Sequence, residues 1–96
     1  MITISIKICS DEYYDTSEKH VNLFKEVNWS CVPNIGQTIF VGLNDEDMEC
    51  TINAKVSRIN FCSDGYIEVC CFIKYLQEEY NNVLDSLVRD GFVNKL

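Results

Sequence analysis

CTINAKVSRINFCSDGYIEVCCFIKY, residues 50–75, decides the fold, because it encodes two strands, a tight turn between them and a break inside the first strand. Apolar residues alternate with polar ones over the first part of this stretch, at Cys50, Ile52, Ala54 and Val56. The phase then shifts, and Ile59 and Phe61 become the apolar pair. Side chains of a strand alternate between its faces, so this shift predicts a β-bulge near Ser57 and Arg58 that bends the sheet sharply.

The second half of the same stretch predicts a hairpin. Asp64-Gly65 is a dipeptide typical of tight hairpin turns. In the strand that follows, Glu68, Cys70 and Lys74 occupy one face. The other face is apolar and consists of Ile67, Val69, Cys71, Ile73 and Tyr75. A bulged strand that pairs with its neighbour in this way favours a strongly curved sheet.

Three further strands are predicted upstream. Residues 2–9 alternate isoleucine with polar residues, and residues 21–32 repeat the pattern with Lys25 as an exception on the apolar face that includes Trp29. Residues 38–42 form a short strand. Between them, residues 33–36 (PNIG) have the chemistry of a turn, since proline fixes φ and glycine accepts a positive φ. We interpret this segment as a corner, because a phosphate-binding loop needs more glycines and a lysine.

The hydrophobic period changes from two to about 3.6 after Tyr75, which predicts a helix over about 77–90. Its apolar stripe consists of Leu76, Tyr80, Val83, Leu84, Leu87 and Val88. Gly91 has the position of a C-terminal cap, from which Phe92 folds back onto the last helical turn. Phe24, Phe40 and Phe72 lie out of phase with the main apolar sets, and we expect them to form a second patch beneath this helix.

The order of elements predicts one mainly β (α+β) domain over residues 1–96. We expect a small five-stranded antiparallel barrel of the SH3-like or OB-like type, or a strongly bent sheet, with one C-terminal amphipathic helix. The predicted strands are about 2–9, 21–32, 38–42, 50–61 and 66–75. A fold of this kind does not by itself supply a function.

The net charge of −7, with only eight basic residues, argues against direct binding to a nucleic-acid backbone, which requires clustered lysine and arginine. The amino terminus has no basic leader, and no apolar run approaches the roughly 18 residues of a membrane span. We therefore expect no membrane association and a cytoplasmic location, where the six cysteines stay reduced.

Acidic residues collect in two of the predicted connections and at the helix start. In a meander the connections 10–20 and 44–49 leave the sheet at the same end, next to the start of the helix. That end would gather ten of the fifteen acids: Asp11, Glu12, Asp15, Glu18, Asp45, Glu46, Asp47, Glu49, Glu78 and Glu79. Two interpretations stay open: a solvated surface, or an acidic rim that binds a basic protein partner.

No cofactor or metal site is predicted. The run NDEDMEC lacks the glycine and glutamate that a calcium-binding EF-hand loop requires, since Cys50 and Val56 stand at those positions counted from Asp45. The cysteines contain no C-x-x-C pair. We expect Cys31, Cys50 and Cys71 to be buried and Cys9, Cys62 and Cys70 to be accessible.

These observations favour a small, acidic, non-enzymatic binding module, of the kind that a phage or bacterial accessory factor would use, docking on a basic protein. The first alternative is a self-associating structural module, such as a homodimer, that uses the apolar patch or the C-terminal helix. The second alternative is an enzyme with His20 as a base and a cysteine thiol as nucleophile. No nucleophile turn accompanies His20, so we expect no catalysis.

Overall fold

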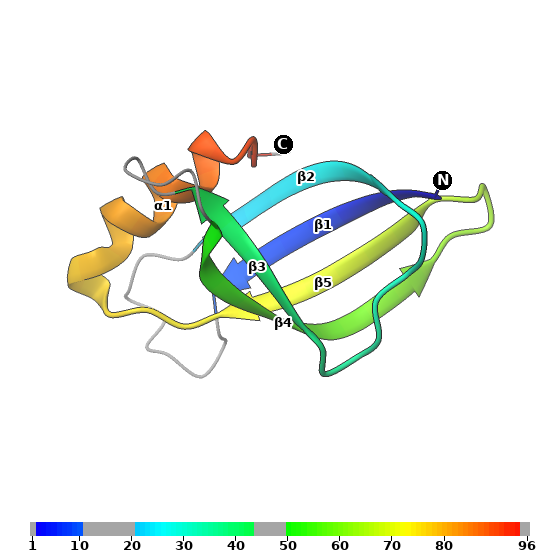
Figure 1. Cartoon of the computed structure of the whole chain (residues 1–96), viewed down its shortest axis with the longest axis horizontal. Coiled ribbons are helices and arrows are strands. Elements are labelled where there is room, and N and C mark those ends of the chain that lie inside the picture. Colours follow the sequence, from blue (N-terminus) through cyan, green and yellow to red (C-terminus); the bar gives the residue numbers. More distant parts are fainter. Residues whose placement is uncertain (1, 11–20, 44–49, 95–96) are drawn as a thin grey trace.

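The computed structural model describes residues 2–10, 21–43 and 50–94 (Figure 1). The strands are β1 (Ile2–Ser10), β2 (Asn22–Trp29), β3 (Thr38–Leu43), β4 (Cys50–Phe61) and β5 (Ile67–Ile73). A short 3-10 helix, η1 (Gln77–Glu79), leads into helix α1 (Tyr80–Arg89). The predicted mainly β fold with one C-terminal helix is confirmed.

The predicted element boundaries agree with the structure except at β2 and β5, which end earlier than expected. After Trp29 the chain runs into the predicted corner, where the Gln37 amide donates to the Asn34 carbonyl at 3.1 Å. The interpretation of residues 33–36 as a turn is therefore confirmed. β5 ends at Ile73 because the chain there leaves the sheet toward η1 and α1.

The strands form one sheet in the order β2-β1-β5-β4-β3. Three neighbouring pairs are antiparallel, but β1 and β5 run parallel, so the prediction of a wholly antiparallel sheet is wrong at this pair. The reason is geometric: in an up-and-down path the first and fifth strands run in the same direction, and they become neighbours when the sheet curls round. This order differs from the Greek key of an OB-type barrel.

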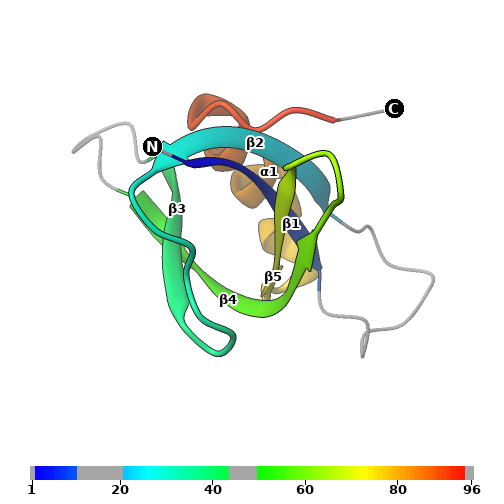
Figure 2. The same ribbon diagram turned by 90° about the vertical axis from the view of Figure 1, so that its right-hand side faces the viewer.

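The curl comes from the bulge that the change of phase predicts. The register of β4 against β5 shifts between Val56 and Arg58, which leaves Ser57 as the extra residue. β4 consequently pairs with β3 through its first half and with β5 through its second half. Figure 2 shows the resulting half-barrel, with β2 and β3 as its two edges.

The inner face of the half-barrel holds the hydrophobic core. Each strand contributes at alternate positions, in agreement with the predicted periodicity. The buried core consists of Ile4, Ile6, Ile8, Val21, Leu23, Val41, Ala54, Val56, Val69, Cys71, Ile73, Leu87 and Phe92. Trp29 packs against this core while remaining partly exposed.

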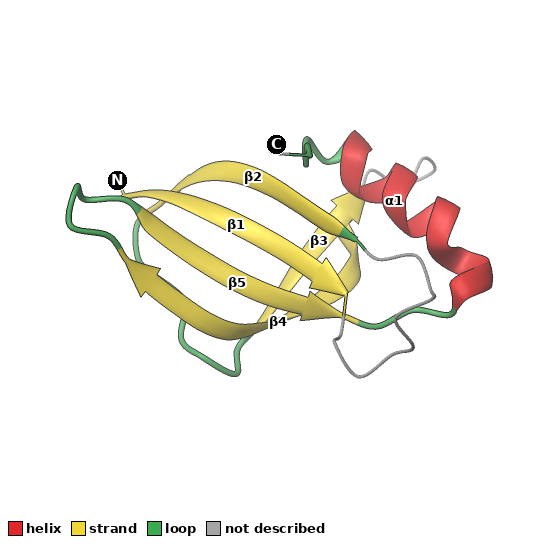
Figure 3. Ribbon diagram, turned by 180° about the vertical axis from the view of Figure 1, so that it is seen from behind, coloured by secondary structure: helices red, strands yellow, loops and turns green. Residues whose placement is uncertain are grey.

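Helix α1 lies at the end of the half-barrel toward which β1 and β5 point (Figures 1 and 3). Leu87 is fully buried, and Tyr80, Val83 and Leu84 pack against the core. Gly91 has φ of +99°, a conformation that glycine accepts readily, and the Phe92 amide donates to the Leu87 carbonyl at 3.0 Å. The predicted helix cap is therefore confirmed.

The prediction that α1 covers Phe24, Phe40 and Phe72 is wrong. None of the three belongs to the core that the helix covers, and Phe40 is 62% exposed. The ring of Phe24 lies 5.7 Å from the Lys7 ammonium instead. The physical reason is that the apolar stripe of α1 closes the open end of the half-barrel, where inward-facing residues meet it, whereas these rings belong to the opposite face of the strands.

Candidate interaction surface

The strand directions determine where the two acidic connections begin. β1, β3 and β5 share one direction, so their carboxyl ends lie at the end of the half-barrel where α1 lies (Figures 1 and 3). The connection 11–20 follows β1, and the connection 44–49 follows β3. The acidic-rim hypothesis requires this arrangement of the strands. Both connections lie outside the described residues.

The chain on either side of the connection 11–20 is held together by Ser10. Its amide donates to the Val21 carbonyl at 3.1 Å, and its hydroxyl accepts from the Val21 amide at 2.6 Å. The same hydroxyl lies 2.7 Å from the Tyr75 hydroxyl, just after β5. This network joins the two ends of the first connection to the segment that leads into η1.

The base of the connection 44–49 is held by α1. Leu43 pairs with Cys50 across the connection, and the Ser86 hydroxyl donates to the Leu43 carbonyl at 3.0 Å. The helix can approach this closely because Gly42 has no side chain. A Cβ there would lie 2.6 Å from Ser86 Oγ, and φ of +82° disfavours any other residue.

Only two of the ten acids of the predicted rim lie in the described part of the chain. Glu78 and Glu79 belong to η1, and both are exposed. The other eight lie outside it: Asp11, Glu12, Asp15, Glu18, Asp45, Glu46, Asp47 and Glu49. These two connections contain a single base, Lys19, and so account for the whole net charge of the protein.

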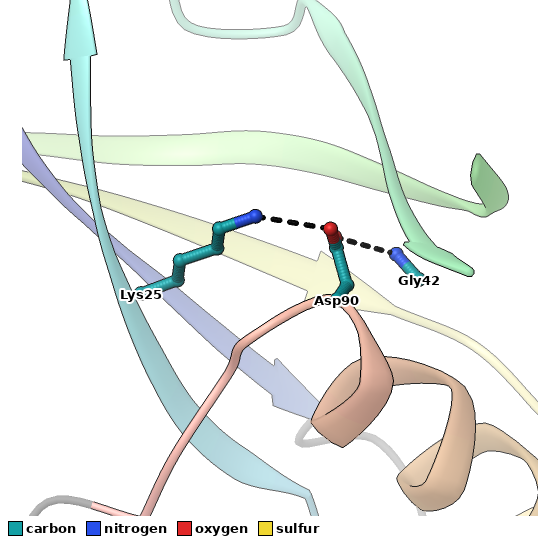
Figure 4. A network of polar contacts seen from close by, with 3 residues as sticks. All are labelled: Lys25, Gly42 and Asp90. Atoms are coloured by element: carbon teal, nitrogen blue, oxygen red, sulfur yellow. Dashed lines mark hydrogen bonds and ion pairs between the residues drawn. The ribbon is translucent and has the colours of Figure 1, made fainter. Parts of the chain in front are cut away.

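A polar clasp of Lys25, Asp90 and Gly42 connects the two edge strands (Figure 4). One carboxylate oxygen of Asp90 accepts from Lys25 Nζ on β2 at 3.0 Å, and the other accepts from the Gly42 amide on β3 at 3.0 Å. The Phe24 and Val93 backbones also exchange two hydrogen bonds of 2.8 Å. The residues at and after the end of α1 thus link β2 and β3, the two edge strands, which do not pair with each other. The break in alternation at Lys25 was the sequence signal for this contact.

Basic residues gather on the outer face of β1 and β4 and just after the end of β5, which sequence reasoning missed. This outer basic face consists of Lys7, Lys55, Arg58 and Lys74, half of the eight bases in the chain. Phe72 lies among them, because it pairs with Lys55 and lines a hollow with Lys7 and Arg58. Their spacing along the sequence is too irregular to reveal the cluster, since these residues come from β1, from β4 and from the segment after β5.

The structure places the cysteines differently from the prediction in three cases. Cys31 and Cys50 are exposed rather than buried, because Cys31 follows the end of β2 and Cys50 begins β4. Cys70 is buried rather than accessible, and on the outer face its thiol donates to the Glu68 carboxylate and accepts from the Asn60 amide. Cys71 is buried and Cys62 exposed, as expected, and Cys9 is partly exposed.

We expect a thiol reagent to label Cys31, Cys50 and Cys62 rapidly in the native protein, and Cys70 and Cys71 slowly. Burial raises the pKa of Cys71 to about 12, so near neutral pH its thiolate fraction is about a thousandfold below that of an exposed cysteine. Burial, and then Glu68, also raise the pKa of Cys70. Peptide mapping by mass spectrometry after timed alkylation measures the rates, with labelling in denaturant as the control. Rapid native labelling of Cys71 would contradict this placement.

Within the described ranges, no group of three or more histidine, cysteine, aspartate or glutamate side chains is arranged to hold a metal ion. His20, the base of the enzyme alternative, lies outside the described residues. None of the helices described is both long enough and apolar enough to cross a membrane. A scan against protein-family models found no match, and searches of curated proteins and of solved structures also found none.

Proposed function

We propose that this protein is a non-enzymatic interaction module that docks on a basic protein partner through its acidic end. The observation that carries the proposal is that β1, β3 and β5 run in the same direction. Because of this, both acidic connections begin at the end of the half-barrel where Glu78 and Glu79 lie on η1. An excess of one charge at one end of a domain steers an oppositely charged partner and raises its association rate. The free cysteines in the described residues fit a reducing cytoplasm.

The stems of the two connections support a binding role. Ser10 and Val21 hold the first stem, and Ser86 holds the second against α1. Acidic residues that leave from fixed stems need less ordering on binding than residues on a free tail, and this reduces the entropic cost of association.

Reversing the charge of Asp45, Glu46, Asp47 and Glu49 to lysine should reduce capture of the partner by more than tenfold. A purified tagged protein is incubated with lysate of the source organism, and bound proteins are quantified by mass spectrometry. Capture should also weaken when salt rises from about 0.05 M to about 0.5 M, because the Debye length falls from roughly 14 Å to roughly 4 Å. Reversing Glu26 and Asp64, which are exposed and lie on β2 and in the β4–β5 turn, away from the helix end, is the control. Unchanged capture by the rim variant would contradict the proposal.

Self-association is the second candidate function, and one observation favours it. Phe40 on the edge strand β3 is 62% exposed, and Val88 of α1 is 54% exposed. Large apolar side chains at a sheet edge and on a helix surface are typical of contacts between subunits. A dimer that persists at high salt in sedimentation experiments would favour this function over the acidic rim.

A further inference from the structure

Within the described part of the chain, the first part of β4 has one edge without a strand beside it. β4 pairs with β5 only from Lys55 onward, because β5 leaves the sheet at Ile73. Val56 exchanges its backbone hydrogen bonds with Gln37 and Gly36 on the β3 side. Backbone groups of alternate residues in a strand point to opposite edges, so those of Thr51 and Asn53 point toward the position that β5 vacates. Among the described residues, neither backbone has a hydrogen-bond partner on that edge.

A cleft of about 910 Å³ lies along this edge. One wall is the exposed edge of β4, and the other is the chain that connects β5 to α1. Its apolar lining includes Ile52, Ile73 and Val83, which also belong to the core or pack against it. The size and the mixture of an apolar floor with a few polar groups are typical of binding clefts.

The charges around the cleft favour an acidic occupant. Lys55 and Lys74 of the outer basic face line it, and among the described lining residues Glu79 is the only acid. Lys55 is exposed and follows directly on the free edge of β4. An acidic side chain of a ligand bound along Thr51–Asn53 would therefore lie beside a lysine ammonium.

We propose that this cleft binds an extended acidic peptide segment of a partner protein, which adds to the free edge of β4 in the place that β5 vacates. A strand edge presents N–H donors and C=O acceptors together, and another extended backbone satisfies both. A small amphipathic carboxylate satisfies only the donors, so the peptide fits better. The cleft lies near the acidic end, since Glu79 and Val83 also line it, but the peptide would bind through the β4 edge and Lys55. This proposal therefore does not depend on the proposed function.

The test uses a fluorescently labelled peptide of about six residues, roughly 20 Å when extended, that alternates glutamate with valine. Fluorescence polarisation measures its affinity for the full chain, and a peptide with lysine in place of glutamate is the control ligand. The variant Asn53→Pro removes one edge donor while keeping the β3–β4 ladder, because the Asn53 amide points away from β3. The variant Lys55→Glu reverses the charge beside the edge.

We expect the glutamate peptide to bind the wild-type protein and the lysine peptide to bind at least about tenfold more weakly. Asn53→Pro should weaken binding about five- to tenfold, the effect of one lost hydrogen bond of about 1 kcal/mol. Lys55→Glu should weaken it at least as much. Amide chemical-shift changes at Thr51 and Asn53 in the wild-type protein provide a second measurement if Asn53→Pro does not fold.

Three results would overturn the proposal. The first is no binding of the glutamate peptide at millimolar concentration. The second is equal binding of the lysine peptide. The third is binding that Asn53→Pro leaves unchanged and that decanoate displaces, which would assign the cleft to small amphipathic anions instead.

Discussion

Phe92→Ala should lower the free energy of unfolding by about 3–5 kcal/mol, the usual cost of replacing a buried aromatic residue by alanine. Phe92 is 1% exposed and belongs to the central core, although it follows the last helix. Its amide donates to the Leu87 carbonyl, and Leu87 is itself fully buried. The ring therefore holds the end of α1 against the half-barrel, and its loss leaves a cavity where the two meet.

Val93→Ala is the matched control for this substitution. Val93 is adjacent in sequence but 60% exposed, and its two hydrogen bonds to Phe24 use the backbone alone. Its side chain should contribute less than about 1 kcal/mol. Urea unfolding monitored by the single tryptophan, Trp29, measures both variants. If Phe92→Ala is destabilised no more than Val93→Ala, the ring does not anchor the helix.

The parts of the fold that depend on local patterns could be predicted from the sequence. The change of phase after Val56 placed the bulge, and Asp64-Gly65 placed the hairpin, because each requires only the residues at that point. The helix and its cap at Gly91 followed from spacing in the same way. These features are decided by backbone geometry over a few residues.

The features that depend on distant residues could not be predicted. The parallel pairing of β1 with β5 joins residues such as Ile6 and Val69, and no local pattern specifies it. Asp90 is 65 positions from Lys25, so the exception at Lys25 showed that a partner was needed without showing which one. The predicted burial of Cys31 and Cys50 was wrong because the alternating pattern was extended to the ends of the strands. Both residues are exposed there even though they are in phase with the core.

The candidate surfaces divide in the same way. The common direction of the odd-numbered strands follows from an up-and-down path, and the sequence therefore suggested one end for the acidic residues. The outer basic face could not be predicted from the sequence, because the net charge gives the sum of all charges and not their positions on the surface. Lys7 and Arg58 become neighbours only when β1 and β4 both flank β5.

Asp90→Ala should lower the free energy of unfolding by about 2–4 kcal/mol. The substitution removes two hydrogen bonds of a charged acceptor, each worth about 1.5–3 kcal/mol, and leaves the Gly42 amide without its partner. The Asp90 side chain is 13% exposed and that of Lys25 30% exposed, so water only partly replaces the lost contacts. Because Asp90 joins β2 to β3, amide exchange should accelerate along both edge strands.

Asp85→Ala provides the comparison, since Asp85 pairs with Arg89 on the same helix at 2.9 Å with side chains 62% and 42% exposed. A solvated pair of this kind contributes about 0.5 kcal/mol or less. Asp90→Asn separates charge from geometry, because an amide oxygen still accepts from the Gly42 amide but attracts Lys25 less. We expect its stability to lie between those of the wild type and Asp90→Ala. If Asp90→Ala and Asp85→Ala lower the free energy of unfolding equally in denaturant, the polar clasp contributes no stability. Core packing by Leu87 and Phe92 alone would then hold the two edges of the half-barrel together.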